Sequence, residues 1–242
     1  MMTGWRARIG FLVPPGNPTV EPEIIALAPP GVSVHFTRMS ASGPAGTHSG
    51  QDERNRSQIA SLDEATRLMA MVCPQVIVMA HTATSYSLGQ AAEAALLARL
   101  EAASGTRVVT AFGSVVAALR SLGVRRVAYA TPYDEALTEQ GRAHLEAHNF
   151  DVVSVARLQG VRNIYEETLA RAYAIGKQAD RPDAEAIFLS GTGMPTLEII
   201  QALEDDLGKP VISSNLAMMW HASRIAKVSA RRPGYGRLLD LP

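Results

Sequence analysis

Short apolar runs alternate with longer helical patterns along the whole chain. Several runs are apolar without alternation, which is typical of parallel strands covered on both faces. The strand-like runs comprise residues 7–13, 32–39, 75–80, 107–112, 125–131, 151–158, 185–190 and 209–214. Helical patterns lie between them, for example at 52–72, 89–103 and 135–148. This order predicts βαβ units and an α/β fold with parallel sheets.

Two joints between a strand and a helix read alike, although they lie far apart in the chain. The stretches QVIVMAHTATSYS (75–87) and AIFLSGTGMPTLE (186–198) each pass from an apolar run through small and hydroxylic residues into a helical pattern. The spacing predicts two half-domains of related topology. We expect an N-terminal half at 1–115, to which residues 214–242 return, and a C-terminal half at 116–213.

Charge and cysteine content limit the classes of protein. The chain has 23 Lys and Arg residues and 23 Asp and Glu residues, so no net field attracts nucleic acid or an anionic membrane. No apolar run reaches the roughly 18 residues of a transmembrane helix, and the first run, IGFLV, is too short for a signal peptide. We expect a cytoplasmic protein without nucleic-acid or membrane partners. The single cysteine, Cys73, excludes an internal disulfide and is expected to be a core residue at a helix end.

Four strand-end loops have the composition of a site for a small anion. They are PPGNPT (14–19), HTATS (81–85), TPYDE (131–135) and SGTGMPT (190–196). Ligands of parallel α/β sheets bind at the carboxyl ends of strands, where helix N-termini offer free N–H groups. Because no loop contains Lys or Arg, we expect hydroxyls, amides and N–H groups to bind the anion.

Helix capping alone also favours such residues, so the loops have a purely structural alternative. Asn17 and Thr131 are expected to cap helices that begin with a proline. Residues 40–51 are expected to form a flexible loop and a candidate lid. No nucleotide-binding glycine motif opens a helix, and we expect no cofactor.

The motifs VPPGNPTVEPE, ATPYDEA, LSGTGMPTLE and RRPGYGRLLD, in this order, resemble the aspartate/glutamate racemase superfamily. The similar branch contains maleate cis-trans isomerases and arylmalonate decarboxylases, and the resemblance covers almost the whole chain. It implies two flavodoxin-like halves related by a pseudo-two-fold axis, with the site in the cleft between them.

The resemblance also implies roles for individual residues. Asn17 and Asn163 are similar to carboxylate ligands of the isomerases, Tyr133 to a tyrosine shared by both subfamilies, and Thr82 to a threonine of the decarboxylases' dioxyanion hole. We count the remaining loop residues as substrate-binding candidates: Pro15, Ser85, Gly191, Thr192 and Gly193.

The chain departs from its relatives in lacking both signature cysteines. His81 stands at the first cysteine position and Gly191 at the second, which argues against two-cysteine racemisation and against covalent addition of a thiolate. His81 is then the candidate acid/base, expected to titrate near neutrality, unless it merely caps the next helix. His144 and His148 are expected on an exposed helical face, and no metal site is expected.

One proton carrier beside a set of uncharged donors suits a one-proton reaction. We expect a cofactor-independent enzyme that acts on a small mono- or dicarboxylic acid through an enediolate-like intermediate, either a decarboxylase or an isomerase. One alternative is a hydrolase in which His81 activates water, Thr84 or Ser85. Another is a non-catalytic binder of carboxylates. The oligomeric state stays open, with a homo-oligomer as one option.

Overall fold

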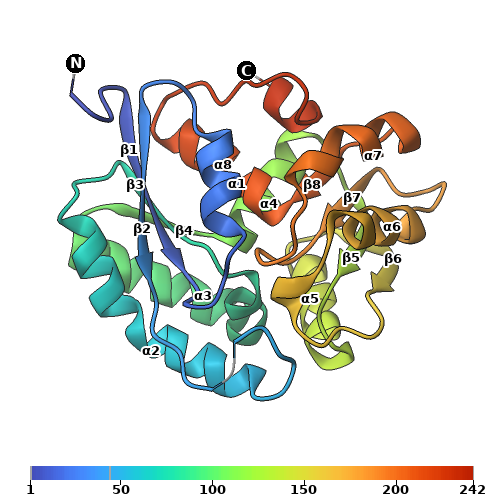
Figure 1. Ribbon diagram of the computed structural model, residues 1–242, viewed down its shortest axis with the longest axis horizontal. Coiled ribbons are helices and arrows are strands. Elements are labelled where there is room, and N and C mark those ends of the chain that lie inside the picture. Colours follow the sequence, from blue (N-terminus) through green and yellow to red (C-terminus); the bar gives the residue numbers. More distant parts are fainter. Residues whose placement is uncertain (1, 44, 242) are drawn as a thin grey trace.

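Two four-stranded parallel sheets form the core of the computed structural model, which describes residues 2–43 and 45–241 (Figure 1). The first sheet has the order β2-β1-β3-β4 and the second β6-β5-β7-β8. The strands of the first sheet are β1 (Ala7–Val13), β2 (Val32–Arg38), β3 (Val76–Met79) and β4 (Arg107–Thr110). Those of the second sheet are β5 (Arg126–Thr131), β6 (Asp151–Arg157), β7 (Ala186–Leu189) and β8 (Val211–Ser213).

The same strand order in both sheets confirms the expected two-half α/β fold. Every residue of β3 (VIVM) and of β7 (AIFL) is buried, which explains why their sequences do not alternate. The edge strands β2 and β6 are mostly half-buried, and their sequences contain more polar residues.

Helices cover both faces of each sheet. Helix α3 begins at Thr82, earlier than the periodicity predicts, because its first turn is built from the HTATS residues and a kink at Gly89 (φ +71°) separates it from the rest. The helices are α1 (Val20–Leu27), α2 (Gln51–Ala70), α3 (Thr82–Ser104), α4 (Ala111–Ser121), α5 (Glu135–Ala147), α6 (Leu169–Ala179), α7 (Ile200–Leu207) and α8 (Ser214–Ile225). Short 3₁₀ turns are η1 (Ile164–Glu166), η2 (Leu197–Ile199) and η3 (Arg237–Asp240).

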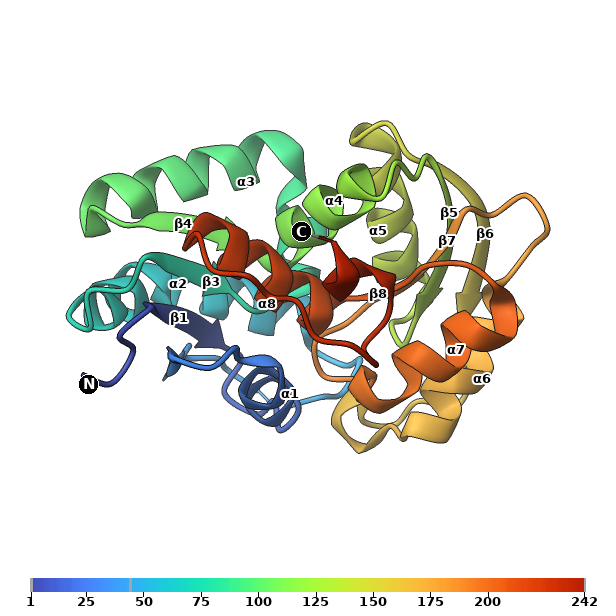
Figure 2. The same ribbon diagram turned by 90° about the horizontal axis from the view of Figure 1, so that it is seen from above.

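Helices α4 and α8 pack together at the junction of the two halves (Figure 2). Each follows the last strand of its sheet, and each begins at a hydroxyl cap: Thr110 accepts from Gly113 N and Ser213 from Leu216 N. Helix α8 also contacts α1 and β3, whereas η3 packs near α7, where Arg237 N donates to Glu204. The boundary proposed between residues 115 and 116 falls inside α4 and stays a prediction.

Cys73 is exposed, so its expected place in the core is wrong. The chain leaves α2 through a tight turn in which Cys73 has φ +52°, and this backbone turns the side chain to solvent. Within residues 2–43 and 45–241, no helix combines the length and apolar character needed to cross a membrane.

Candidate active site

Three of the four predicted loops meet at the carboxyl ends of the strands. Asn17 Nδ2 donates to Thr192 Oγ1 (3.2 Å), and that hydroxyl in turn donates to the carbonyl oxygen of Ala80 (3.1 Å). Thr19 Oγ1 donates to Gly193 O (2.8 Å). The first, second and fourth loops are therefore joined by buried, uncharged hydrogen bonds that cross between the halves.

The two polar atoms of the Asn17 side chain make different contacts. Its Oδ1 accepts from Thr19 N (2.8 Å) and Val20 N (3.1 Å), while Nδ2 faces Thr192. The expectation that Asn17 occupies the N-cap position before Pro18 is wrong, because α1 begins two residues later and Thr19 is its N-cap; the Asn17 side chain caps the free N–H groups from the preceding turn. The surrounding turn is held from outside by Arg38, whose guanidinium donates to the carbonyls of Pro14, Pro15 and Asn17. Pro15 itself is exposed.

His81 stands in extended backbone directly before α3 and is only 5% exposed. Its Nδ1 lies 2.7 Å from Thr84 Oγ1. Burial, and secondarily the positive charge of Arg54, lowers the pKa of His81 to about 4. The expectation that His81 titrates near neutrality is therefore wrong, because burial and a nearby cation disfavour the charged form of the imidazole. At pH 7 the ring is neutral.

Tyr133 and Gly191 lie close together within the second half. A Cβ at Gly191 would lie 3.4 Å from Tyr133 Oη, and the φ of +98° at Gly191 disfavours any side chain there. Tyr133 is 2% exposed, and burial raises the pKa of its phenol well above the usual value, so the hydroxyl keeps its proton. Thr131 is not the cap of α5, because the turn extends to Asp134, which accepts from Leu137 N.

Thr82 and Ser85 are buried, but their hydroxyls bond to other protein groups. Thr82 Oγ1 donates to Ser214 Oγ (3.0 Å) at the start of α8, and Ser85 Oγ donates to Glu93 Oε1 (2.6 Å). The loop that contains them is thereby fixed to the start of α8 and to the body of α3.

Asn163 lies on the opposite side of the junction, against the loop of residues 40–50, in which residue 44 lies outside the described residues. Its Oδ1 accepts from Tyr165 N (2.9 Å), and a Cβ at Gly46 would fall 1.8 Å from the same oxygen. Ile164 N donates to Gly46 O (2.7 Å). His48 Nε2 lies 3.1 Å from Pro132 O. The candidate lid is thus closed on the second half.

Sequence reasoning missed Tyr165 and Arg54. The Tyr165 ring lies over both glycine turns, since a Cβ at Gly16 or Gly193 would come within 3.2 or 2.6 Å of ring carbons. Burial raises the pKa of Tyr165 to about 12. Arg54 is 4% exposed and donates to Ser49 O and Gln51 Oε1. No local pattern distinguished Arg54 within the charged first turns of α2.

Arg54 corrects the expectation of a site without nearby cations. In the described part of the chain it has no ion pair with a carboxylate, and its charge acts on both His81 and Tyr165. An anion bound beside His81 would therefore lie in a positive field supplied from α2.

Glu23, in the first turn of α1, contacts the second half of the protein. It is buried and accepts from Thr196 N (2.6 Å), Leu197 N (2.9 Å) and Asn215 Nδ2 (2.7 Å). Burial raises the pKa of this carboxyl despite those hydrogen bonds. Glu23 therefore joins α1 to the second half behind the strand-end loops.

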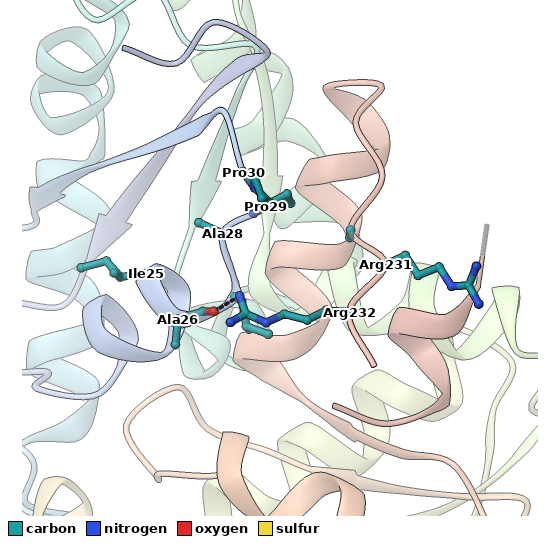
Figure 3. Close-up of a pocket in the computed structure, with 9 residues that line it drawn as sticks. Ile25, Ala26, Ala28, Pro29, Pro30, Arg231 and Arg232 are labelled. Carbon is teal, nitrogen blue, oxygen red and sulfur yellow. Dashed lines mark hydrogen bonds between the residues drawn. The ribbon is translucent and has the colours of Figure 1, made fainter. Parts of the chain in front are cut away.

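A surface cavity of about 590 Å³ lies elsewhere, between the end of α1 and the C-terminal tail (Figure 3). Arg232 reaches across it and donates to the carbonyl of Ala26. The end of α1 and the turn into β2 lie at the amino ends of the strands, so this cavity is separate from the candidate site. It is lined by residues 25–30 and 230–232.

Together the fold and the site define an α/β protein of two parallel-sheet halves, with strand-end loops joined by buried hydrogen bonds at their junction and the buried cation Arg54 nearby. A family profile described as arylmalonate decarboxylase matches residues 9–239. An arylmalonate decarboxylase from Bordetella bronchiseptica is 34% identical over 96% of both chains. A maleate isomerase from Nocardia farcinica is 31% identical over 96% of this chain and 95% of its own.

Solved structures agree with the sequence matches. A Nocardia farcinica maleate cis-trans isomerase with a bound succinylcysteine intermediate superimposes with a TM-score of 0.87 at 27% identity, covering 96% of this chain and 98% of its own. An arylmalonate decarboxylase structure gives a TM-score of 0.80 at 30% identity, covering 96% and 99%. This chain belongs to the arylmalonate decarboxylase family. The prediction of an isomerase- or decarboxylase-type enzyme is confirmed at this level.

Proposed function

We propose that the protein decarboxylates a small malonate-like diacid without a cofactor, with His81 as the proton carrier. The observation that supports this most is the chain of contacts from Asn17 through Thr192 to Ala80, the residue before His81. It joins uncharged groups of both halves to the backbone that precedes a buried imidazole. The only cysteine is exposed and remote from these loops, so a succinylcysteine like that of the Nocardia farcinica isomerase has no thiol here.

One carboxylate of the substrate would bind to the donors of both halves. In the proposed complex this carboxylate accepts hydrogen bonds from N–H groups of the 191–193 turn, from the phenol of Tyr133 and from the amide of Asn17. Tyr133 suits this role because its raised pKa keeps it a donor. Donors of this kind stabilise negative charge that develops on a substrate oxygen.

The proposed reaction breaks the bond between Cα and the second carboxylate, which leaves as carbon dioxide. The electron pair passes into the retained carboxylate as an enediolate, and His81 then delivers a proton to Cα. Overall, the diacid dianion and one proton give a monoanion and carbon dioxide. His81 is neutral at pH 7, but a dianion next to the ring raises its pKa and lets it take up the proton from solvent.

The test is turnover of alkyl- and arylmalonates by the intact protein, followed by carbon dioxide release and deuterium incorporation at Cα. His81→Gln should lower kcat by roughly 10²–10⁴-fold while ligand binding persists. His35→Gln is the matched control, since His35 contacts Ser33 on the edge strand β2. Full activity of His81→Gln contradicts the proposal. Failure of the unaltered protein to turn over any diacid favours a carboxylate binder.

Isomerisation by proton transfer is the second candidate, since a neutral imidazole can also remove and return a proton next to a carboxylate. It predicts deuterium exchange at that carbon without release of carbon dioxide. A hydrolase would use the short contact between His81 and Thr84, 2.7 Å. Ser85 is a poor nucleophile for it, because its hydroxyl donates to Glu93. Thr84→Val would abolish turnover only in the hydrolase.

A further inference from the structure

Three potential metal ligands converge between α3 and α5, outside the strand-end loops. The ligand atoms of Glu93, His144 and His148 all lie within 4.8 Å of one another. The histidines are four residues apart on α5 and thus share one face of the helix. The sequence expectation that this face is exposed is wrong, because α5 packs against α3 and leaves His144 only 4% exposed.

The spacing of the first two ligands suits a shared cation. Glu93 Oε2 and His144 Nε2 lie 3.2 Å apart. The two atoms are within hydrogen-bonding range of each other. Two ligands held at about 2.0–2.1 Å from a tetrahedral zinc ion are separated by roughly 3.3 Å.

The third ligand atom needs a partner. His148 Nε2 is buried and has no hydrogen-bond partner within residues 2–43 and 45–241. A buried polar atom without a partner costs about 1–3 kcal/mol, and a metal ion would satisfy it.

The surroundings orient the ligands. Ser85 Oγ donates to Glu93 Oε1 (2.6 Å) and leaves Oε2 directed at His144. The ring of Phe112 packs against His144 and His148, with centroids 4.4 and 5.5 Å away. Hydrogen bonds to ligands and an apolar shell are what metal sites use to fix ligand geometry.

We propose that Glu93, His144 and His148 bind one divalent transition-metal ion, such as zinc, with water as a further ligand. Two imidazoles and one carboxylate are a donor set that zinc accepts. The ion would join α3 of the first half to α5 of the second. Through the Ser85 hydrogen bond it would also fix the kinked start of α3, and with it the HTATS loop. This role is structural and does not depend on the proposed reaction.

The test is zinc binding by chelator-treated protein. All variants carry the substitution Cys73→Ser, so that the exposed thiol does not contribute to zinc binding. We expect one zinc per chain by calorimetry, a raised melting temperature, and a tetrahedral absorption spectrum with Co²⁺. His148→Ala leaves the Glu93–His144 contact intact and should weaken zinc binding by more than about tenfold. His35→Ala, which lies outside the cluster, should bind as the parent does.

Two results would overturn the proposal. One is a parent protein that takes up no zinc and shows no tetrahedral cobalt spectrum. The other is a His148→Ala protein that keeps the parent affinity. Should His148→Ala fail to fold, judged by near-UV circular dichroism, His148→Gln provides the same comparison with a side chain that retains polarity and size.

Discussion

Asn17 and Thr192 are 175 residues apart in the chain, yet Asn17 Nδ2 lies 3.2 Å from Thr192 Oγ1 in the buried junction of the two halves. Thr192 Oγ1 in turn donates a hydrogen bond to the backbone carbonyl of Ala80, the residue before His81. This contact is made by neutral groups, and the Thr192 hydroxyl links the first loop to the backbone that precedes His81.

Asn17→Asp should separate substrate binding from helix capping. The aspartate keeps an acceptor for Thr19 N and Val20 N but replaces the amide donor with a negative oxygen. We expect KM for a carboxylate to rise at least about tenfold, which corresponds to roughly 1.4 kcal/mol, with little loss of stability. Asn17→Ala should instead cost about 1 kcal/mol of stability in urea unfolding, since it removes the cap. Equal KM values for Asn17→Asp and the unaltered protein would contradict the assigned role.

Tyr133→Phe tests the phenol as a donor to developing charge. The ring, which packs with Tyr86 at a centroid distance of 6.3 Å, is retained, so the fold should be preserved. We expect kcat to fall by roughly 10²-fold, because one donor to the intermediate is lost. Tyr173→Phe is the control, since the Tyr173 hydroxyl bonds only to surface groups around Asp206. An unchanged kcat would remove Tyr133 from the mechanism.

Gly46→Ala tests the closed loop. A Cβ at this position would fall 1.8 Å from Asn163 Oδ1, so the loop must withdraw from the second half. We expect kcat/KM to drop by roughly tenfold or more and cleavage of the loop by protease to accelerate. Gly43→Ala is the matched control, because its φ of +85° is similar to the +75° of Gly46 while no atom lies within 4 Å of the added carbon. If both variants behave alike, backbone strain and not loop closure explains the effect.

Glu23→Gln should destabilise the junction. Glu23 accepts from two backbone N–H groups and from Asn215, so an amide would turn one acceptor into a donor that faces donors. We expect a loss of about 1–3 kcal/mol in the free energy of unfolding. Glu21→Gln, which removes only the exposed ion pair with Arg38, should cost less than about 1 kcal/mol. A loss no greater than that of Glu21→Gln would show that Glu23 is not a junction contact.

The buried His81 should make the protein less stable in acid. Its folded pKa of about 4 lies below the ordinary 6.5, so between these values the unfolded chain binds more protons and stability falls as pH falls. Above pH 6.5 the contribution is constant. The full difference corresponds to about 3 kcal/mol at most. The unfolding free energy of His81→Gln, measured from pH 7 to 4, should decline less steeply; parallel curves would show that His81 is not buried neutral.

The strands and the strand-end loops were predictable because their signals are local. The runs of β3 and β7 are apolar since both faces are covered, and the residues of the loops suit helix starts and close turns. The duplication was also visible as repeated local patterns, which is why the two sheets with one strand order agree with expectation.

Some errors were local as well. The capping of α5 by Asp134 and not Thr131 depends on how far the turn continues after β5. The exposure of Cys73 depends on a left-handed backbone after α2. The periodicity of the apolar residues predicts neither feature. It indicates that a helix or strand is present more reliably than it indicates where that element ends.

The sequence by itself determined the α/β class, the two halves and the presence of hydroxyl- and glycine-rich turns at the strand ends, because periodicity and capping act over a few residues. Only the tertiary structure decided that Arg54 and Tyr165 lie at the site, that Glu93 meets His144, and that His81 is neutral. These properties arise when separate segments of the chain, such as those of Glu93 and His144, which are 51 residues apart, exclude water from one another, and no local pattern encodes which segments those will be.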